Sequence, residues 1–312
     1  MHDSQTSYPS PTPTPSLSQR INIATRPSHT HLNALILSLL PLGLPRHATD
    51  PTLYAKGLQH VLPIYEAFEG AFRLLSLRCE NEDGGQGLPL VEAMSALYVQ
   101  KLERVERLRR DIEKILGTNH HFSEERARLD AFTTHMNTSI ASKPHLLLAY
   151  TWLLYMALFS GGRYIRVKLR QAGSGFWTGS GGEKGTDMDD YLSFWTFDGQ
   201  EDGEDIKTEF KRRFAGVEAY LTDEECEDVV QEAVYIMQSM LEVVGEIAET
   251  VGTRQAGLAI GQYGEIGRGE KSTVEVAEAD EPSMRWLFLK HVLPMGMAEL
   301  IAGASRAVTT GI

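Results

Sequence analysis

Two histidines, His29 and His31, lie in residues 24–33, where the spacing of apolar residues predicts an amphipathic helix. An imidazole on such a helix can serve as an axial ligand to iron, as it does in many haem proteins. At about 100° per residue the two side chains point about 200° apart, so both cannot face one pocket. Because a histidine near a helix start is more often structural or solvated, this segment alone leaves both interpretations open.

A second feature is Ser160-Gly161-Gly162, which interrupts residues 144–171, an apolar segment otherwise typical of a helix. Each glycine in a helix interior costs about 1 kcal/mol relative to alanine. Glycines at such a place indicate a kink, or a flat ligand that lies against bare backbone. Close packing between two helices explains the glycines equally well, so this motif also has two interpretations.

Together these motifs resemble those of the heme oxygenase family. The segment around His29 is similar to the family's proximal helix, in which Ala-Thr-Lys/Arg-x-x-His-Thr carries the axial haem ligand. Residues 144–162 resemble the distal helix without a gap, down to Tyr155 and Ser160. Residues 194–197, Phe-Trp-Thr-Phe, resemble the family's Phe-Phe-Thr-Phe, and Lys207 follows ten residues later, as it does there. The matches occur in order between residues 19 and 250.

The resemblance implies a role for individual residues. His29 becomes the proximal iron ligand, and the backbone of Gly161 and Gly162 faces the distal side of a haem. Two propionates entering a chain of net charge −12 need nearby cations. The matching basic residues are Arg26, Lys207 and Lys211, although residues 207–213 are equally typical of a solvated basic face. The expected haem-binding residues also include Tyr155, and the expected distal catalytic residues also include Ser160 and Leu158.

This chain also departs from the family's pattern. Leu158 stands where the family commonly has an aspartate that holds water near iron-bound oxygen. Leu154 replaces an arginine that meets a propionate, and Leu62 matches a tyrosine of the distal water network. Leucine cannot hold water by hydrogen bonding, so the usual route to oxygen activation is weakened. Pro27 must begin or kink the proximal helix, because proline cannot donate a helical hydrogen bond.

The resemblance implies oxidative cleavage of haem to biliverdin, carbon monoxide and ferrous iron. Haem would be both substrate and cofactor, with O₂ and with electrons from a reductase partner. One alternative, motivated by Leu158, is a haem-binding or haem-sensing protein without turnover, or a weak haem peroxidase. Another is an enzyme that acts on small heterocycles without haem, since the same helical superfamily includes such enzymes.

Composition limits the other possibilities. The 312 residues are 42% apolar and 23% charged, which is ordinary for a globular protein of one large domain or at most two. With 30 basic and 42 acidic residues, the chain is not expected to bind nucleic acid. Two cysteines exclude a disulfide framework and a cysteine-rich metal site, and indicate a cytoplasmic protein.

The periodicity predicts an all-α, multi-helical domain over residues 19–250. Residues 1–18 are rich in serine, threonine and proline and are expected to be disordered. Residues 251–312 are expected to form a flexible loop and an apolar helix, which could contact a membrane peripherally. The predicted helices lie near 19–40, 50–78, 88–116, 123–141, 144–171, 204–219, 222–250 and 282–306.

Overall fold

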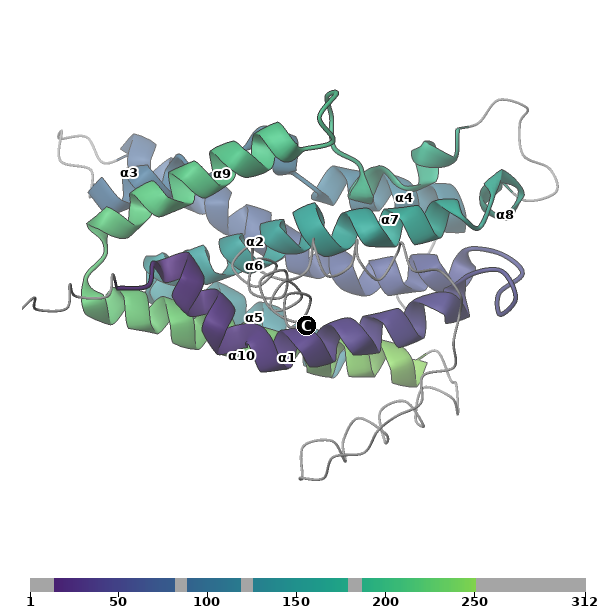
Figure 1. The fold of residues 1–312 in the computed structure, drawn as a ribbon, viewed down its shortest axis with the longest axis horizontal. Coiled ribbons are helices and arrows are strands. Elements are labelled where there is room, and N and C mark those ends of the chain that lie inside the picture. Colours follow the sequence, from purple (N-terminus) through teal and green to yellow (C-terminus); the bar gives the residue numbers. More distant parts are fainter. Residues whose placement is uncertain (1–13, 82–88, 119–125, 179–186, 251–312) are drawn as a thin grey trace, which may run out of the picture.

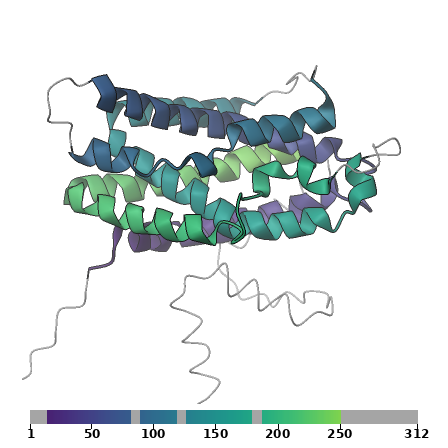
Figure 2. The same cartoon turned by 90° about the horizontal axis from the view of Figure 1, so that it is seen from above.

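The computed structural model describes residues 14–81, 89–118, 126–178 and 187–250. Every regular element in these ranges is helical, which confirms the predicted all-α class. Figures 1 and 2 show the long helices running along one common axis. The α-helices are α1 (Leu17–Leu39), α2 (Thr52–Asn81), α3 (Pro89–Ser95), α4 (Val105–Leu116), α5 (Ala127–Ser142), α6 (Leu147–Ala157), α7 (Arg163–Arg170), α8 (Ser174–Thr178), α9 (Glu204–Val217) and α10 (Asp223–Thr250).

Most predicted helices are confirmed with boundaries that differ by a few residues. They correspond to α1, α2, α5, α9 and α10, and residues 144–171 contain α6 and α7. Between the predicted helices at 144–171 and 204–219 the structure has a further short helix, α8. The loop and helix predicted for residues 251–312 lie outside the described residues, as does most of the predicted N-terminal tail.

The single helix predicted over residues 88–116 is wrong. In the structure α3 ends at Ser95 and α4 begins at Val105. The buried carboxylate of Glu69, on α2, accepts backbone N–H bonds from Arg104 at 2.5 Å and from Val105 at 3.2 Å. A carboxylate is a favourable partner for the unpaired N–H groups at a helix start. This cap comes from a distant part of the chain, so periodicity alone could not reveal the break.

Pro27 does not begin α1, which starts ten residues earlier. Ser16 and Gln19 form a capping box there, in which each side chain bonds the other residue's backbone N–H. Pro27 lies inside the helix, where it cannot donate the bond that residue 27 would otherwise make to Ile23. Figure 1 shows that α1 changes direction along its length, in agreement with the predicted kink.

The central helix spans Pro144–Arg170 when its turns are taken together. By length and composition it could cross a membrane, with a mean hydropathy of 1.2 in its most apolar window. However, 72% of that window is buried inside the protein, as is typical of a core helix. α10 and α2 pack against α6, so most of the central helix is covered by other helices, although part of its surface stays open to solvent.

The segment after α8 is fixed to α4 by one buried carboxylate. Asp111 is 0% exposed, and it accepts backbone N–H bonds from Ser193 at 3.0 Å and from Phe194 at 2.8 Å. The Ser193 hydroxyl donates a third bond at 2.5 Å. Because buried N–H groups must be paired, Asp111 determines where residues 193–197 lie against the central helix.

These contacts predict a pH-dependent effect at Asp111. Burial raises its pKa to about 6, above the value of about 3.9 in an unfolded chain. Its contribution to stability is therefore greatest below about pH 4 and is lost as the pH rises through 6. Asp111→Asn should remove this dependence and should cost about 1–3 kcal/mol, since an amide nitrogen cannot accept the bonds.

Urea unfolding of the wild type and Asp111→Asn at pH 4, 5, 6 and 7 checks this prediction. Asp130→Asn changes an exposed carboxyl on α5 and serves as the control. The same pH dependence in Asp111→Asn and the wild type would contradict the assignment.

Candidate functional site

A hydrogen bond joins α1 to the central helix. The indole Nε1 of Trp152, on α6, donates to Oδ1 of Asn22, on α1, at 3.0 Å. His29 lies seven residues after Asn22, which brings it within about 20° of the same helix face. His31 lies about 180° from Asn22, on the opposite face. The contact therefore selects His29, not His31, as the imidazole that faces the central helix.

The same hydrogen bond fixes the position of each helix along the axis of the other. α1 and the α6–α7 helix run in the same direction in both views (Figures 1 and 2). From the Trp152–Asn22 contact, a rise of 1.5 Å per residue places His29 about 10 Å and Gly161 about 13 Å along the axis. On ideal helical geometry, His29 and Gly161 are thus expected at a similar level along their two helices.

The Ser-Gly-Gly motif forms an irregular turn, as its composition predicts. Residues Leu158–Gly162 are a π-helical turn between α6 and α7, a rare element that is frequent at functional sites. No described atom lies within 4 Å of the position that a Cβ on Gly161 would occupy. A Cβ on Gly162, by contrast, would lie 3.1 Å from Cε3 of Trp195. Gly161 therefore borders open space, whereas Gly162 allows close packing.

The central helix has a flank that solvent can reach. Residues along this flank follow helical spacing and include Leu153, Ala157, Ser160, Gly161 and Tyr164, whereas other half-buried or exposed residues of the helix, such as Met156 and Val167, lie off it. Leu158 and Tyr155, two of the expected site residues, point into the core instead and are 2% and 1% exposed. Tyr155 packs edge-on against Phe68 and Phe210. Direct ligand contact by Leu158 and Tyr155 stays a prediction, and their positions give both a packing role.

Three titratable side chains can be reached by solvent, yet neighbouring atoms remove part of their hydration. The side chains of His29 on α1 and Lys211 on α9 are exposed, and Tyr164 on α7 is half-buried. Nevertheless desolvation lowers the pKa of His29 and of Lys211, and it raises the pKa of Tyr164. Neighbouring atoms therefore remove part of the hydration of each group even though solvent still reaches its side chain.

Basic side chains lie near one another on α9. Lys207 and Lys211 are four residues apart, and the charge of Lys207 further lowers the pKa of Lys211. Lys207 forms an ion pair with Glu204 at 3.3 Å, whereas Lys211 forms none within the described ranges. The exposed Arg26 lies four residues after Asn22, on the flank of α1 that carries His29. These cations can receive an anionic ligand.

A buried polar cluster on the core side of α6 escaped the sequence reasoning. The guanidinium of Arg104 is fully buried, with its carbon 4.9 Å from the centre of the Phe197 ring. Burial lowers its pKa to about 10, and burial raises the pKa of Tyr65 and Tyr155. In the described structure Arg104 Nε and Nη2 and the Tyr155 hydroxyl have no protein partner. Buried polar atoms of this kind normally bond to ordered water.

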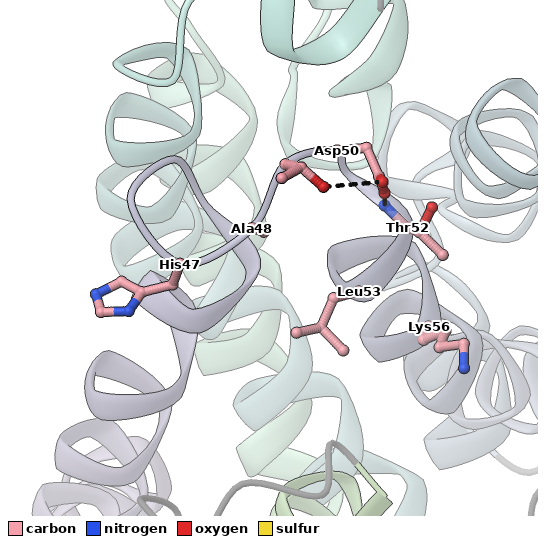
Figure 3. A pocket seen from close by; sticks show the side chains of 7 residues that line it. His47, Ala48, Asp50, Thr52, Leu53 and Lys56 are labelled. Atoms are coloured by element: carbon pink, nitrogen blue, oxygen red, sulfur yellow. Dashed lines mark hydrogen bonds between the residues drawn. The ribbon is translucent and has the colours of Figure 1, made fainter.

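The hollow drawn in Figure 3 has a different character. It has a volume of about 310 Å³ and lies where α1 is joined to α2. Its acidic group, Asp50, accepts the backbone N–H of Thr52 at 2.9 Å and so caps α2. Within the described residues no three His, Cys, Asp or Glu side chains are grouped to hold a bare metal ion. The candidate site that the described residues leave is therefore the region of His29, on α1, and of Gly161, on the π turn.

Known proteins share this chain's sequence pattern. The family model described as heme oxygenase matches residues 15–246. The chain belongs to the heme oxygenase family. It is 27% identical over 178 residues to "Heme-binding protein HMX1" of Saccharomyces cerevisiae, which is 53% of each chain. It is 25% identical over 158 residues to "Heme oxygenase 2" of Synechocystis sp., or 50% of this chain and 56% of that one. The chain spans about half the length of these curated relatives.

Solved structures share the fold. Heme oxygenase 2 from Chlamydomonas reinhardtii, without heme, has a TM-score of 0.60 at 21% identity, covering 74% of this chain and 96% of that one. Heme oxygenase-2 from Synechocystis sp., in complex with heme and NO, has a TM-score of 0.60 at 19% identity, covering 83% and 94%. At these identities the likeness establishes the all-α heme oxygenase fold and leaves residue roles to the site itself.

The site predicts how His29 titrates. Because desolvation lowers its pKa, the imidazole of the ligand-free protein should titrate below the ordinary value of about 6.5. The neutral form that can ligate iron is then retained to lower pH, and binding through His29 is lost only below that pKa. NMR titration of the histidine ring protons, assigned with His29→Gln, measures this directly. A pKa of His29 above 6.5 would contradict the desolvated environment.

Proposed function

We propose that this chain binds one haem between His29 and the π turn, and that it cleaves haem oxidatively to biliverdin, carbon monoxide and ferrous iron. Electrons would come from a reductase partner. The observation that supports the proposal best is the Trp152–Asn22 hydrogen bond, from which helical geometry places His29 and Gly161 at a similar level. One is a desolvated imidazole that solvent can reach, and the other has no described atom on its open side.

The residues present fit the chemistry of a haem. A neutral imidazole is the form that coordinates iron, and the lowered pKa of His29 favours it. Gly161 offers bare backbone where a flat macrocycle can lie close. Lys211, Lys207 and Arg26 supply positive charge for two carboxylates, in a chain whose net charge is −12. The family membership supports the same ligand.

Haem supplies the oxidative chemistry, since with O₂ and electrons it hydroxylates its own macrocycle. The chain's task is to hold the ring, leave room on the distal side and present hydrogen-bond donors there. Ser160 places a hydroxyl group on the open flank, and a hydroxyl group can donate its proton to a distal ligand. Behind α6, the hydroxyl of Tyr65 donates to the Leu154 carbonyl at 3.5 Å. The buried polar cluster there could hold water despite the leucine at position 158.

Haem binding without turnover is the second candidate. Leu158 is 2% exposed in an apolar environment, so it provides no polar group on the distal side. The name of one relative, "Heme-binding protein HMX1", describes binding alone. Restoring an aspartate is a poor test here, because Leu158→Asp would bury an unpaired carboxylate in the core. The predicted domain boundaries, cytoplasmic location and membrane contact of residues 251–312 stay predictions.

Turnover distinguishes the two candidates. Protein loaded with haemin is mixed with ascorbate in air, with catalase present, and its absorption spectrum is followed. Loss of the Soret band with growth of a biliverdin band is expected. A stable Soret band would leave haem binding without cleavage, and absence of any Soret band would overturn both candidates.

The role of Lys211 can be tested through the propionates. Lys211→Ala should weaken haemin affinity about fivefold at low salt, because one charge-assisted contact is worth about 1 kcal/mol. The loss should shrink in high salt and should vanish with haem dimethyl ester, which has no free carboxylates. Lys114→Ala, whose lysine pairs with Asp190 at 3.0 Å, is the matched control. An equal loss with the ester would refute the assignment.

A further inference from the structure

Trp195 supports the π turn from the side that faces away from the open flank. Cε3 of its ring lies 3.1 Å from the position that a Cβ on Gly162 would take. At the other edge of the ring, the indole Nε1 donates a 2.8 Å hydrogen bond to the hydroxyl of Tyr54, on α2. Tyr54 is itself 8% exposed and packs edge-on against Trp177. The indole is therefore held between α2 and the backbone of the turn.

The segment that carries Trp195 is held firmly as well. Asp111 fixes the two preceding residues to α4 through three hydrogen bonds. The Phe194 ring packs against the indole with its centre 4.4 Å away. Arg166, on α7, donates to the Trp195 carbonyl at 3.3 Å. With its backbone and both ring edges restrained, the indole can act as a rigid support.

The π turn meets no such support on its other side. No described atom lies within 4 Å of the open side of Gly161. The contact between Gly162 and Trp195 is therefore one of the contacts that set the position of the turn across the site, beside the ring of Phe159, which stacks on Phe197 with the ring centres 5.1 Å apart. Phenylalanine, which the family motif has at this position, has no N–H to donate to Tyr54.

We infer that Trp195 is a positioning residue, which sets the free height between the π turn and the distal face of a bound haem. The inference rests on the proposed function, since it presumes that haem lies against Gly161. Trp195 acts through Gly162 and touches no reacting atom. By setting the height of the turn, Trp195 determines which distal ligands fit beneath it. It also determines which meso edge of the haem ring has room there.

Two substitutions should move the turn in opposite directions. In Gly162→Ala the added methyl group meets the indole at 3.1 Å and pushes the turn toward the open side. In Trp195→Leu the indole is gone, and the turn can move back into the vacated space. Both substitutions destabilise the fold, but the first narrows the distal space and the second widens it.

The experiment measures the distal space with ligands of two sizes. Imidazole is titrated into the ferric haem complex and carbon monoxide into the reduced complex, with binding followed by absorption. Gly162→Ala should weaken imidazole binding about fivefold and Trp195→Leu should strengthen it about fivefold, a change of about 1 kcal/mol in each direction. Carbon monoxide, which is smaller, should change by less than about twofold in both variants.

Matched control variants separate an effect on the position of the π turn from an effect on the stability of the fold. Gly57→Ala adds a methyl group to a helical glycine with open space around it, and Phe72→Leu removes a buried aromatic ring from α2. Neither should alter the ratio of imidazole to carbon monoxide affinity. The double variant Gly162→Ala/Trp195→Leu should return imidazole affinity toward the wild-type value, since the methyl group then fills the vacated space. If Gly162→Ala does not fold, Trp195→Phe and Trp195→Leu should still give graded widening.

The outcomes distinguish this inference from the proposed function. If the wild type forms no haem complex, the proposed function fails and the inference fails with it. If the wild type binds haem but both substitutions shift imidazole affinity in the same direction, the inference alone is overturned. Opposite shifts with recovery in the double variant would support it.

Discussion

The hydrogen bond from Trp152 to Asn22 is the contact on which the geometry of the site depends. It joins α1 to α6 at 3.0 Å, and it therefore decides both which face of α1 meets the central helix and at what level. An indole N–H is a donor only, and an asparagine oxygen accepts it, so the pairing has one orientation. From this point His29 and the π turn are reached after similar distances along their helices. α10 supports α1 along its length and keeps that alignment.

Charged groups and apolar groups lie on different sides of the proposed site. The proximal and propionate sides carry His29, Arg26 and the two lysines of α9, all of which solvent can reach. The distal side is mostly apolar, with polar groups limited to hydroxyls on the open flank and to the buried cluster behind α6. This division favours binding of an anionic, flat, apolar ligand strongly. It gives the distal side less means to direct oxygen chemistry than an aspartate there would provide.

The sequence allowed most of the helices and the irregular Ser-Gly-Gly turn to be predicted, because both follow from local spacing and composition. The choice of His29 came from the family resemblance and stays a prediction. The facing of Leu158, the first residue of the π turn, could not be predicted in the same way. A π turn holds more residues than the 3.6 of an α-turn, so it changes which side chains face the open flank after residue 157. The break before α4 and the burial of Arg104 depend on Glu69, which lies 35 residues away in sequence. Such pairings exist only once the helices have packed.

The central claim is that His29 holds the iron of a bound haem, and spectroscopy of two single variants tests it most directly. Haemin is titrated into His29→Ala and His31→Ala, and affinity and the spin-state bands are compared with the wild type. The account predicts that His29→Ala loses the axial imidazole spectrum and about tenfold or more in affinity, and that free imidazole restores the spectrum. His31→Ala should match the wild type, because His31 lies on the opposite face of α1. An unchanged spectrum in His29→Ala, or equal losses in both variants, would contradict the account.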